Sequence, residues 1–175
     1  VPASTPAVYM PQVDAPFRTT WPQTAPPSQA FYVGKHRFLA THGLNRHGYG
    51  AVAIVWNADA DVIRPVAAVG LKWTLFGGGS PFMAGARNFD AIRARAEKVE
   101  KATAFVWSDI NGNQHMDAEE FQFLTAPKGP VLAGCYFERD LAVTVGSLNL
   151  GRLPAPTINE HGVPIYDVTK AERVA

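Results

Sequence analysis

The stretch Phe105-Val-Trp-Ser-Asp-Ile-Asn-Gly-Asn-Gln-His-Met-Asp-Ala-Glu-Glu-Phe121 holds the strongest pattern in the chain. From residue 109 to residue 120, oxygen-bearing residues recur as they do in a calcium-binding loop of the EF-hand ligand pattern. Calcium takes about six to eight oxygen ligands, and such a loop supplies them at positions 1, 3, 5, 7, 9 and 12. The sequence therefore predicts a calcium site with these ligands: Asp109, Asn111, Asn113, His115 through its backbone carbonyl, Asp117 and Glu120.

Two features of this loop depart from the EF-hand pattern. Position 6, normally Gly because the sharp turn needs an unusual backbone conformation, is Gln114. A left-handed backbone at that residue would introduce about 1 kcal/mol of strain. Asn111 and Asn113 stand where Asp is common, so fewer charges are supplied and the affinity should be weaker than in a tight buffer site. The alternative is an Asx-rich surface turn that binds no metal.

The segment that leads into the loop indicates the role of the metal. An EF-hand proper enters its loop from an amphipathic helix, whereas Thr103-Ala-Phe-Val-Trp-Ser108 is typical of a strand. A loop between strands fixes a long connection and lacks the helix pair that opens when a calcium sensor binds its ion. We therefore expect the metal to be structural.

The rest of the chain is predicted to be mainly β. Short apolar runs separated by polar turns predict strands at residues 31–33, 36–41, 51–56 and 62–69, paired as an antiparallel meander. A further strand is predicted at residues 104–107, directly before the calcium loop. Pro65 lacks a backbone donor, so its strand lies at a sheet edge, or Pro65 sits where no ladder donor is required. Residues 131–138 and 141–145 predict a hairpin that turns at Arg139-Asp140, and residues 163–168 a last strand.

One helix is predicted between the strands, over roughly residues 89–101. Asn88 is a good N-cap, and Asp90 lies in the first turn, where the helix dipole favours a carboxylate. An apolar stripe at helical spacing predicts the buried face: Phe89, Ile92, Ala96 and Val99. On the other face, ion pairs at i, i+4 are expected between Arg93 and Glu97 and between Glu97 and Lys101.

Composition limits the classes of partner. The chain has 175 residues, 47% hydrophobic and 18% charged, with a formal net charge of +1, which suits one ordinary globular core. It has no Lys/Arg-rich run for a nucleic acid. No apolar run approaches the ~20 residues of a membrane span, so we expect a soluble chain or one attached through something else. The single cysteine, Cys135, is expected to be a small buried hydrophobe.

The first 30 residues differ in composition from the rest. They carry half of the 14 prolines, which excludes a helix or a central strand and predicts an extended arm over residues 1–30. Tyr9, Phe17 and Trp21 are spaced along it as anchors, which favours an arm that lies on a surface. The predicted organisation is this arm, a β region over residues 31–168 with the calcium loop, and a tail over residues 169–175. Because the chain starts at Val1, we expect a processed or excised piece.

The motif around the loop resembles the "vWxDxNGDGxxxxxE" segments in blades of bacterial, mostly secreted, β-propeller proteins. Residues 34–41, 52–56 and 62–70 resemble successive strands of a blade, and Gly162-Val-Pro-Ile-Tyr-Asp167 resembles the "G-x-P-x-Y-D" that closes a later segment. The resemblance covers roughly residues 31–168. It implies a secreted, periplasmic or cell-surface protein with bound calcium and blade-like antiparallel sheets. No catalytic residue carries over from that family.

The chain is too short to close a propeller, which needs four or more blades of ~40 residues. We therefore expect a partial propeller that pairs with other polypeptide, either the rest of a longer chain or partner subunits. The predicted function is a calcium-stabilised, non-catalytic binding or assembly module. The alternative is part of a propeller enzyme, a lyase or hydrolase that acts on polysaccharide. Carbohydrate is the other candidate partner, since four aromatic residues could stack on sugars: Trp21, Tyr49, Trp56 and Trp73.

Other clusters carry weaker signals. His42 and His47, with His36 one strand earlier, could form a transition-metal site, but histidines in loops are more often hydrogen-bonded only. Gly77-Gly-Gly-Ser80 lacks the Lys-Ser/Thr ending of a phosphate-binding loop and is expected to be a turn. No carboxylate pair for glycoside hydrolysis and no Gly-x-Ser-x-Gly motif can be assigned.

Overall fold

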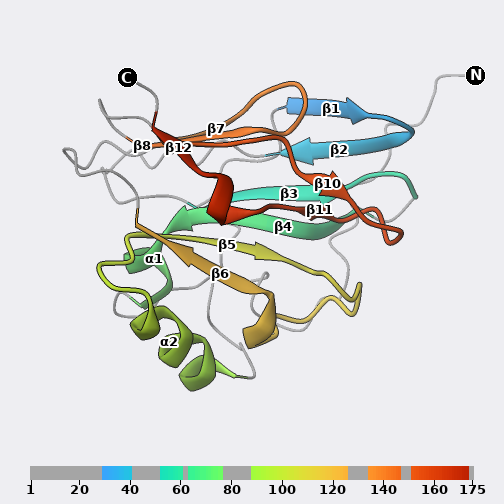
Figure 1. Cartoon of the computed structure of the whole chain (residues 1–175). Helices are drawn as coiled ribbons and strands as arrows, with labels where there is room; N and C mark the ends of the chain where they lie inside the picture. The colour runs from blue at the N-terminus through green and yellow to red at the C-terminus, as the bar shows by residue number, and fades with distance from the viewer. Residues whose placement is uncertain are drawn as a thin grey trace, which may run out of the picture.

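The computed structural model describes residues 29–40, 52–60, 63–76, 88–125, 134–146 and 151–173. Within these ranges the chain is mainly β, with antiparallel sheets and one long helix, as the sequence predicts. Figure 1 shows helices below a central sheet and a second, smaller sheet above it. The predicted arm lies outside the described residues up to residue 28, and β1 begins at Gln29, within its predicted range.

The central sheet has six strands that pair in sequence order. They are β1 (Gln29–Val33), β2 (His36–Ala40), β3 (Ala53–Asn57), β4 (Arg64–Leu71), β5 (Ala104–Ser108) and β6 (Phe121–Leu124). Every neighbouring pair is antiparallel, so the meander predicted for the first four strands is confirmed, and it continues through β5 and β6. Strand β6, which directly follows the predicted calcium loop, was not predicted.

Pro65 lies in a central strand, so its predicted place at an edge is wrong. Strand β4 pairs with β3 on one side and with β5 on the other. The β3–β4 register shifts between Val55 and Trp56, where Val55 faces Ala67 and Trp56 faces Pro65. Such an irregularity tolerates a residue without a backbone donor. The other predicted placement, at a position where no ladder donor is required, therefore agrees with this register.

Successive residues of the inner strands are buried on opposite faces of the central sheet. On β5, Phe105 and Trp107 pack in one cluster with the helix residues Ile92 and Ala96. Val106, between them, packs in the other cluster with residues of the second sheet. A strand that is buried on both faces lacks the polar alternation of a solvent-facing strand, which explains its continuous apolar sequence.

The predicted helix is present and somewhat shorter than expected. Helix α2 spans Phe89–Lys98, with Ile92 and Ala96 buried and Phe89 and Val99 partly buried, so the predicted apolar stripe is confirmed. Asn88 precedes the helix, but its side chain makes no capping hydrogen bond. The expected Arg93–Glu97 pair is replaced by contacts of the Arg93 guanidinium with two aromatic rings. A short helix that was not predicted, α1 (Lys72–Phe76), follows β4.

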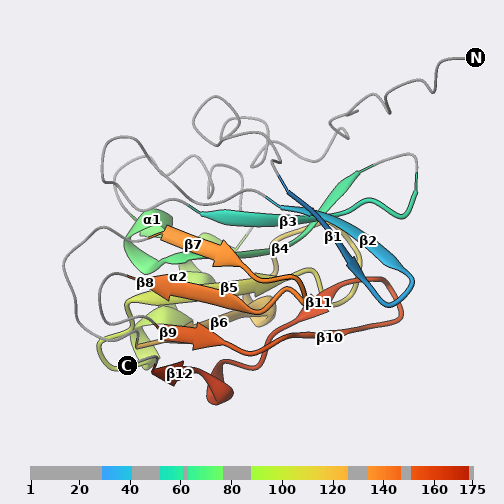
Figure 2. The same ribbon diagram turned by 90° about the horizontal axis from the view of Figure 1, so that it is seen from above.

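The second sheet has four strands in the order β12-β9-β8-β7. They are β7 (Gly134–Phe137), β8 (Val143–Gly146), β9 (Gly151–Leu153) and β12 (Glu172–Arg173). The predicted hairpin that turns at Arg139-Asp140 joins β7 to β8 and is confirmed. Seen from above in Figure 2, β7, β8 and β9 lie over the central sheet, with α2 behind it. Two short 3-10 helices are also present, η3 (Ala118–Glu120) and η4 (Val168–Lys170).

A two-stranded hairpin of β10 (Thr157–Ile158) and β11 (Pro164–Ile165) lies beside the central sheet. The strand predicted at residues 163–168 is present only as β11, and η4 begins at Val168. The described residues form no closed barrel or propeller. Neither helix in them is long and apolar enough to cross a membrane.

Candidate metal centre

The predicted calcium loop connects β5 to β6, two neighbouring antiparallel strands. Asp109 directly follows β5, and Glu120 directly precedes β6. Because Trp107 and Phe121 face each other in the ladder, the two ends of the loop are held close together. The sheet thus brings the first and the last predicted ligand to one place, and the loop curls between them.

The backbone of the loop has the turn that its EF-hand pattern requires. Gln114 has a φ of 62°, so the residue at position 6 is in the left-handed region, and Gly112 has a φ of 69°. This conformation aims the Gln114 backbone N–H at Asp109, whose Oδ1 and Oδ2 lie 3.2 and 3.3 Å away. The strain expected at Gln114 is therefore present, since an L-residue lacks the freedom of glycine there.

Two of the predicted ligands are buried carboxyl groups. Asp109 is 0% exposed and Glu120 is 3% exposed. Burial raises the pKa of Glu120 to about 7, and hydrogen bonds oppose this shift only in part. Burial also raises the pKa of Asp109. The hydrogen bond from the backbone N–H of Gln114 and the positive charge of Arg64 oppose this rise in part. Buried carboxylates need a compensating positive charge, and a cation in the loop would supply it.

Glu120 is oriented by a hydrogen bond from the core of the sheet. The Trp107 Nε1 donates to Oε2 of Glu120 at 3.0 Å, and both side chains are buried. The backbone N–H groups of Asp117 and Asn111 approach the same carboxyl group at 3.4 and 3.5 Å. A carboxylate oxygen can accept a hydrogen bond and still bind a metal, so this contact fixes the side chain without blocking it. Trp107 had no predicted role, although it belongs to the quoted motif.

The outer ligands form the hydrogen bonds of an Asx-rich turn. The backbone N–H of Asn113 donates to Oδ1 of Asn111 at 2.9 Å, and that of His115 donates to Oδ1 of Asn113 at 2.7 Å. The side-chain amides of Asn111 and Asn113 donate to Oδ2 of Asp117 at 3.3 and 2.8 Å. These contacts gather the outer ligands around Asp117. A calcium ion would require the amide oxygens to turn toward it.

The β10–β11 hairpin holds the loop from outside. The Ser108 hydroxyl donates to the carbonyl of Pro164 at 2.8 Å, and the Asn159 amide donates to the carbonyl of Ile110 at 2.9 Å. Ser108 is fully buried at the start of the loop. The loop is therefore packed against a second part of the chain, which limits how far its ligands can separate.

The donor set fits a hard cation, but the carboxylates stand apart in this structure. Among the described residues, no three His, Cys, Asp or Glu side chains are grouped closely enough to hold a metal ion. Asp117 is engaged with the two asparagine amides, whereas Asp109 and Glu120 lie deeper. Binding of one calcium ion by all of these residues would therefore require Asp117 and the two asparagine amides to rearrange.

The other predicted sites have different outcomes. His36 forms a hydrogen bond of 2.6 Å between its Nδ1 and Oδ2 of Asp59, whereas His42 and His47 lie outside the described residues. Trp56 is only 2% exposed, so the prediction that it could stack on a sugar is wrong. The remaining features fall on undescribed parts: Trp21, Tyr49, Gly77-Gly-Gly-Ser80, and the side chains of Trp73 and Cys135. No protein-family model, no curated protein and no solved structure matches the chain.

Proposed function

We propose that the loop of residues 109–120 binds a calcium ion that fixes the connection between β5 and β6. The observation that carries the proposal is the pair of buried carboxyl groups, Asp109 and Glu120, at the two ends of a loop whose position 6 is left-handed. An Asx-rich surface turn accounts for the bonds among Asn111, Asn113 and Asp117. It gives no reason to bury two acidic side chains beside each other.

The ion would act as a structural element. Its ligands would come from Asp109, Asn111, Asn113, Asp117 and Glu120, together with the His115 carbonyl. Since the loop is anchored at both ends by the sheet and held by the β10–β11 hairpin, ion binding would stabilise this edge of the fold. Three carboxylates and a strained position 6 favour a weak site. Weak sites, with dissociation constants of about 10⁻⁴ to 10⁻³ M, suit extracellular modules.

Calorimetric titration of the metal-free chain with calcium tests this proposal. We expect one ion per chain, and we expect Glu120→Gln to abolish binding because it removes a buried ligand. Glu119→Gln is the matched control, since Glu119 is exposed and has no place in the ligand pattern. Calcium at a hundredfold excess over its dissociation constant should stabilise the wild type by about 2.7 kcal/mol. No heat of binding in the wild type, or equal binding in Glu120→Gln, would disprove the site.

We further propose that the chain is a non-catalytic binding or assembly module of a secreted or cell-surface protein, built as blade-like sheets of a partial propeller. The entry into the loop from a strand and the meander of antiparallel strands support this proposal. Among the described strands, those that pair on one side only are β1 and β6 of the central sheet, β7 and β12 of the second sheet, and both strands of the β10–β11 hairpin. An open strand edge is a place where another polypeptide can pair.

The mass of the native assembly tests the module proposal. We expect the chain to be recovered with further polypeptide, covalently continuous or bound, that covers at least one of these edges. A soluble monomer of this chain that melts cooperatively, shows no further partner and protects its edge amides from hydrogen exchange would show the proposal to be wrong.

A further inference from the structure

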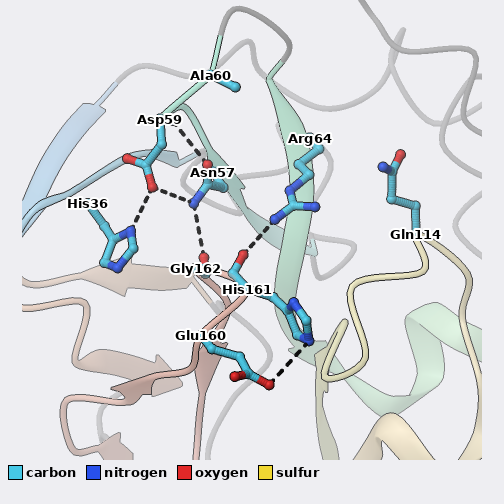
Figure 3. Close-up of a pocket in the computed structure, with 9 residues that line it drawn as sticks. All are labelled: His36, Asn57, Asp59, Ala60, Arg64, Gln114, Glu160, His161 and Gly162. Carbon is cyan, nitrogen blue, oxygen red and sulfur yellow. Dashed lines mark hydrogen bonds and ion pairs between the residues drawn. The ribbon is translucent and has the colours of Figure 1, made fainter.

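A cavity of about 350 Å³ lies beside the loop of residues 109–120 and is lined by residues from four separate parts of the chain. Its polar lining residues are His36, Asn57, Asp59, Arg64, Gln114, Glu160 and His161. Figure 3 shows Arg64 and Gln114 on one side, His36 and Asp59 on the other, and the tip of the β10–β11 hairpin between them. The cavity has the size of many small-molecule sites.

The carboxylate of Asp59 is already occupied by donors. Its Oδ1 accepts from the backbone N–H of Arg37 at 2.6 Å. Its Oδ2 lies 2.6 Å from Nδ1 of His36 and accepts from the Asn57 amide at 3.0 Å. Burial alone would raise the pKa of Asp59, but these hydrogen bonds outweigh it and lower that pKa, so the carboxylate stays ionised. Asp59 therefore orients its neighbours and offers little to a ligand.

The backbone oxygens of the hairpin tip are occupied as well. The Asn57 amide donates to the carbonyl of Gly162 at 3.0 Å, and Nη2 of Arg64 donates to the carbonyl of His161 at 2.5 Å. These two contacts clamp the tip between the ends of β3 and β4. They also turn the tip's acceptors inward, toward protein donors and away from the cavity.

The groups that remain are mostly donors. Within the described part of the chain, Nη2 is the one guanidinium nitrogen of Arg64 in a hydrogen bond, which leaves most of its five N–H groups available. The side-chain amide of Gln114 likewise forms no hydrogen bond there, whereas Nδ1 of His36 donates to Asp59, which makes Nε2 of the neutral imidazole an acceptor. His161 contributes another imidazole, which packs against Gly112 of the metal loop. A ligand that satisfies these groups must supply acceptors.

Two lining carboxylates, those of Asp59 and Glu160, oppose an anion, and their positions limit the effect. Asp59 is held by its three donors on the side of the cavity opposite Arg64. The side chain of Glu160 is 89% exposed, and its Oε1 lies 3.8 Å from Nε2 of His161. The charge of Glu160 is screened by water, whereas Arg64 is partly buried. The positive charge of Arg64 therefore acts more strongly than the negative charge of Glu160 on a molecule inside the cavity.

We propose that this cavity binds a small oxyanion, a carboxylate or a phosphate group, with Arg64 as the main anchor and His161 and Gln114 as further donors. A guanidinium recognises both groups because its parallel N–H bonds match two oxygens of a planar or tetrahedral anion. The proposal does not depend on calcium in the loop. Arg64 is a binding residue here and has no assigned part in catalysis.

Nuclear magnetic resonance of the full chain tests the site with defined probes in metal-free buffer. Inorganic phosphate and acetate are titrated separately at constant ionic strength, with sodium chloride and glucose as controls, while the Arg64 Nε–H and histidine ring signals are followed. We expect saturable shifts with at least one of the two oxyanions and none with chloride or glucose. Acetate alone identifies a carboxylate site, phosphate alone a phosphate site, and both a general oxyanion site.

Variants assign the binding to this cavity. Arg64→Gln should weaken binding at least tenfold, whereas Lys98→Gln, which removes one positive charge from the exposed face of α2, should leave it unchanged. His161→Ala should weaken binding about threefold. It keeps the backbone carbonyl that accepts from Arg64, so the hairpin stays in place. This variant therefore tests the site even if Arg64→Gln loosens the hairpin. Absence of saturable shifts in the wild type, or equal affinities in wild type, Arg64→Gln and His161→Ala, would overturn the proposal.

Discussion

Trp107 and Glu120 are joined by a hydrogen bond of 3.0 Å between the indole Nε1 and the carboxyl Oε2, and both side chains are buried. Trp107 belongs to the packed face of β5, and Glu120 is the last predicted ligand of the loop. The bond therefore links the core of the sheet to the proposed metal site. An apolar ring in this place could fill part of the space but could not donate to the carboxyl group, so the N–H group has a role beyond packing.

Replacing Trp107 by Phe should weaken calcium binding about tenfold, because the carboxylate loses the donor that orients it. The free energy of unfolding should fall by about 1–3 kcal/mol, through the lost hydrogen bond and a smaller ring. Trp56→Phe is the matched control, since Trp56 is buried in the same cluster on β3. It should lower stability and leave the calcium affinity unchanged. Equal calcium affinities in Trp107→Phe and wild type would show that the bond does not position the ligand.

Gln114→Gly should stabilise the chain and raise its calcium affinity. Gln114 has a φ of 62°, and glycine removes the strain of a side chain in that region, which amounts to about 1 kcal/mol. Gln114→Ala is the matched control, because it removes the same amide and retains the Cβ atom. Thermal melts of the three proteins with and without calcium provide the measurement. A melting temperature for Gln114→Gly at or below that of Gln114→Ala would contradict the strain argument.

The metal-free chain should lose stability as the pH rises from about 5 to about 7.5. Burial raises the pKa of Glu120 from 4.5 to about 7, so the folded state holds a proton that the unfolded chain has released. The stability from this proton is complete below the unfolded pKa and disappears as the pH passes the folded pKa, by up to roughly 3 kcal/mol. Calcium affinity should rise over the same window, because the ligand must be ionised.

Melting curves at several pH values, in metal-free buffer and in calcium, check this dependence. Glu120→Gln should flatten the metal-free slope, since the glutamine does not titrate. Asp59, Glu138 and Asp167 have lowered pKa values, so the stability that they contribute is lost only at lower pH. A metal-free wild type that becomes more stable between pH 5 and pH 7.5, with a slope equal to that of Glu120→Gln, would show that Glu120 is not the responsible group.

The local patterns of the sequence predicted much of the fold. Apolar runs gave the strands of the meander, and the stripe at Ile92 and Ala96 gave the buried face of α2. The spacing from Asp109 to Glu120 predicted a curled loop with a special backbone conformation at Gln114, which the structure has. These features depend on neighbours within one element or one turn, so they are readable without knowledge of the tertiary structure.

Features that depend on distant contacts were missed. Strands β9, β10 and β12 have only two or three residues each, too few for a recognisable alternation, and β11 covers only two residues of the strand predicted at residues 163–168. The Arg93 guanidinium lies 5.0 Å from the ring centroid of Phe89, a contact that replaced the expected ion pair. The cavity could not be predicted, because His36 and Asp59 meet Glu160 and His161 only when the β10–β11 hairpin packs beside the central sheet.

Gly162→Ala should test how much stability the hairpin tip contributes. Gly162 has a φ of 70°, and a Cβ atom there would lie 2.6 Å from Nδ2 of Asn57. That nitrogen donates to both Asp59 and the Gly162 carbonyl, so the added methyl group would combine backbone strain with the loss of the clamp. We expect the free energy of unfolding to fall by about 2–4 kcal/mol.

Gly34→Ala separates the two causes. Gly34 has a φ of 58° in the turn between β1 and β2, and a Cβ atom there would meet nothing within 4 Å. It should therefore show the backbone strain alone, about 1 kcal/mol. Chemical denaturation of both variants gives the difference, which measures the clash with Asn57. Equal losses in the two variants would mean that the tip relaxes freely around the methyl group and that Asn57 does not hold the hairpin against the sheet.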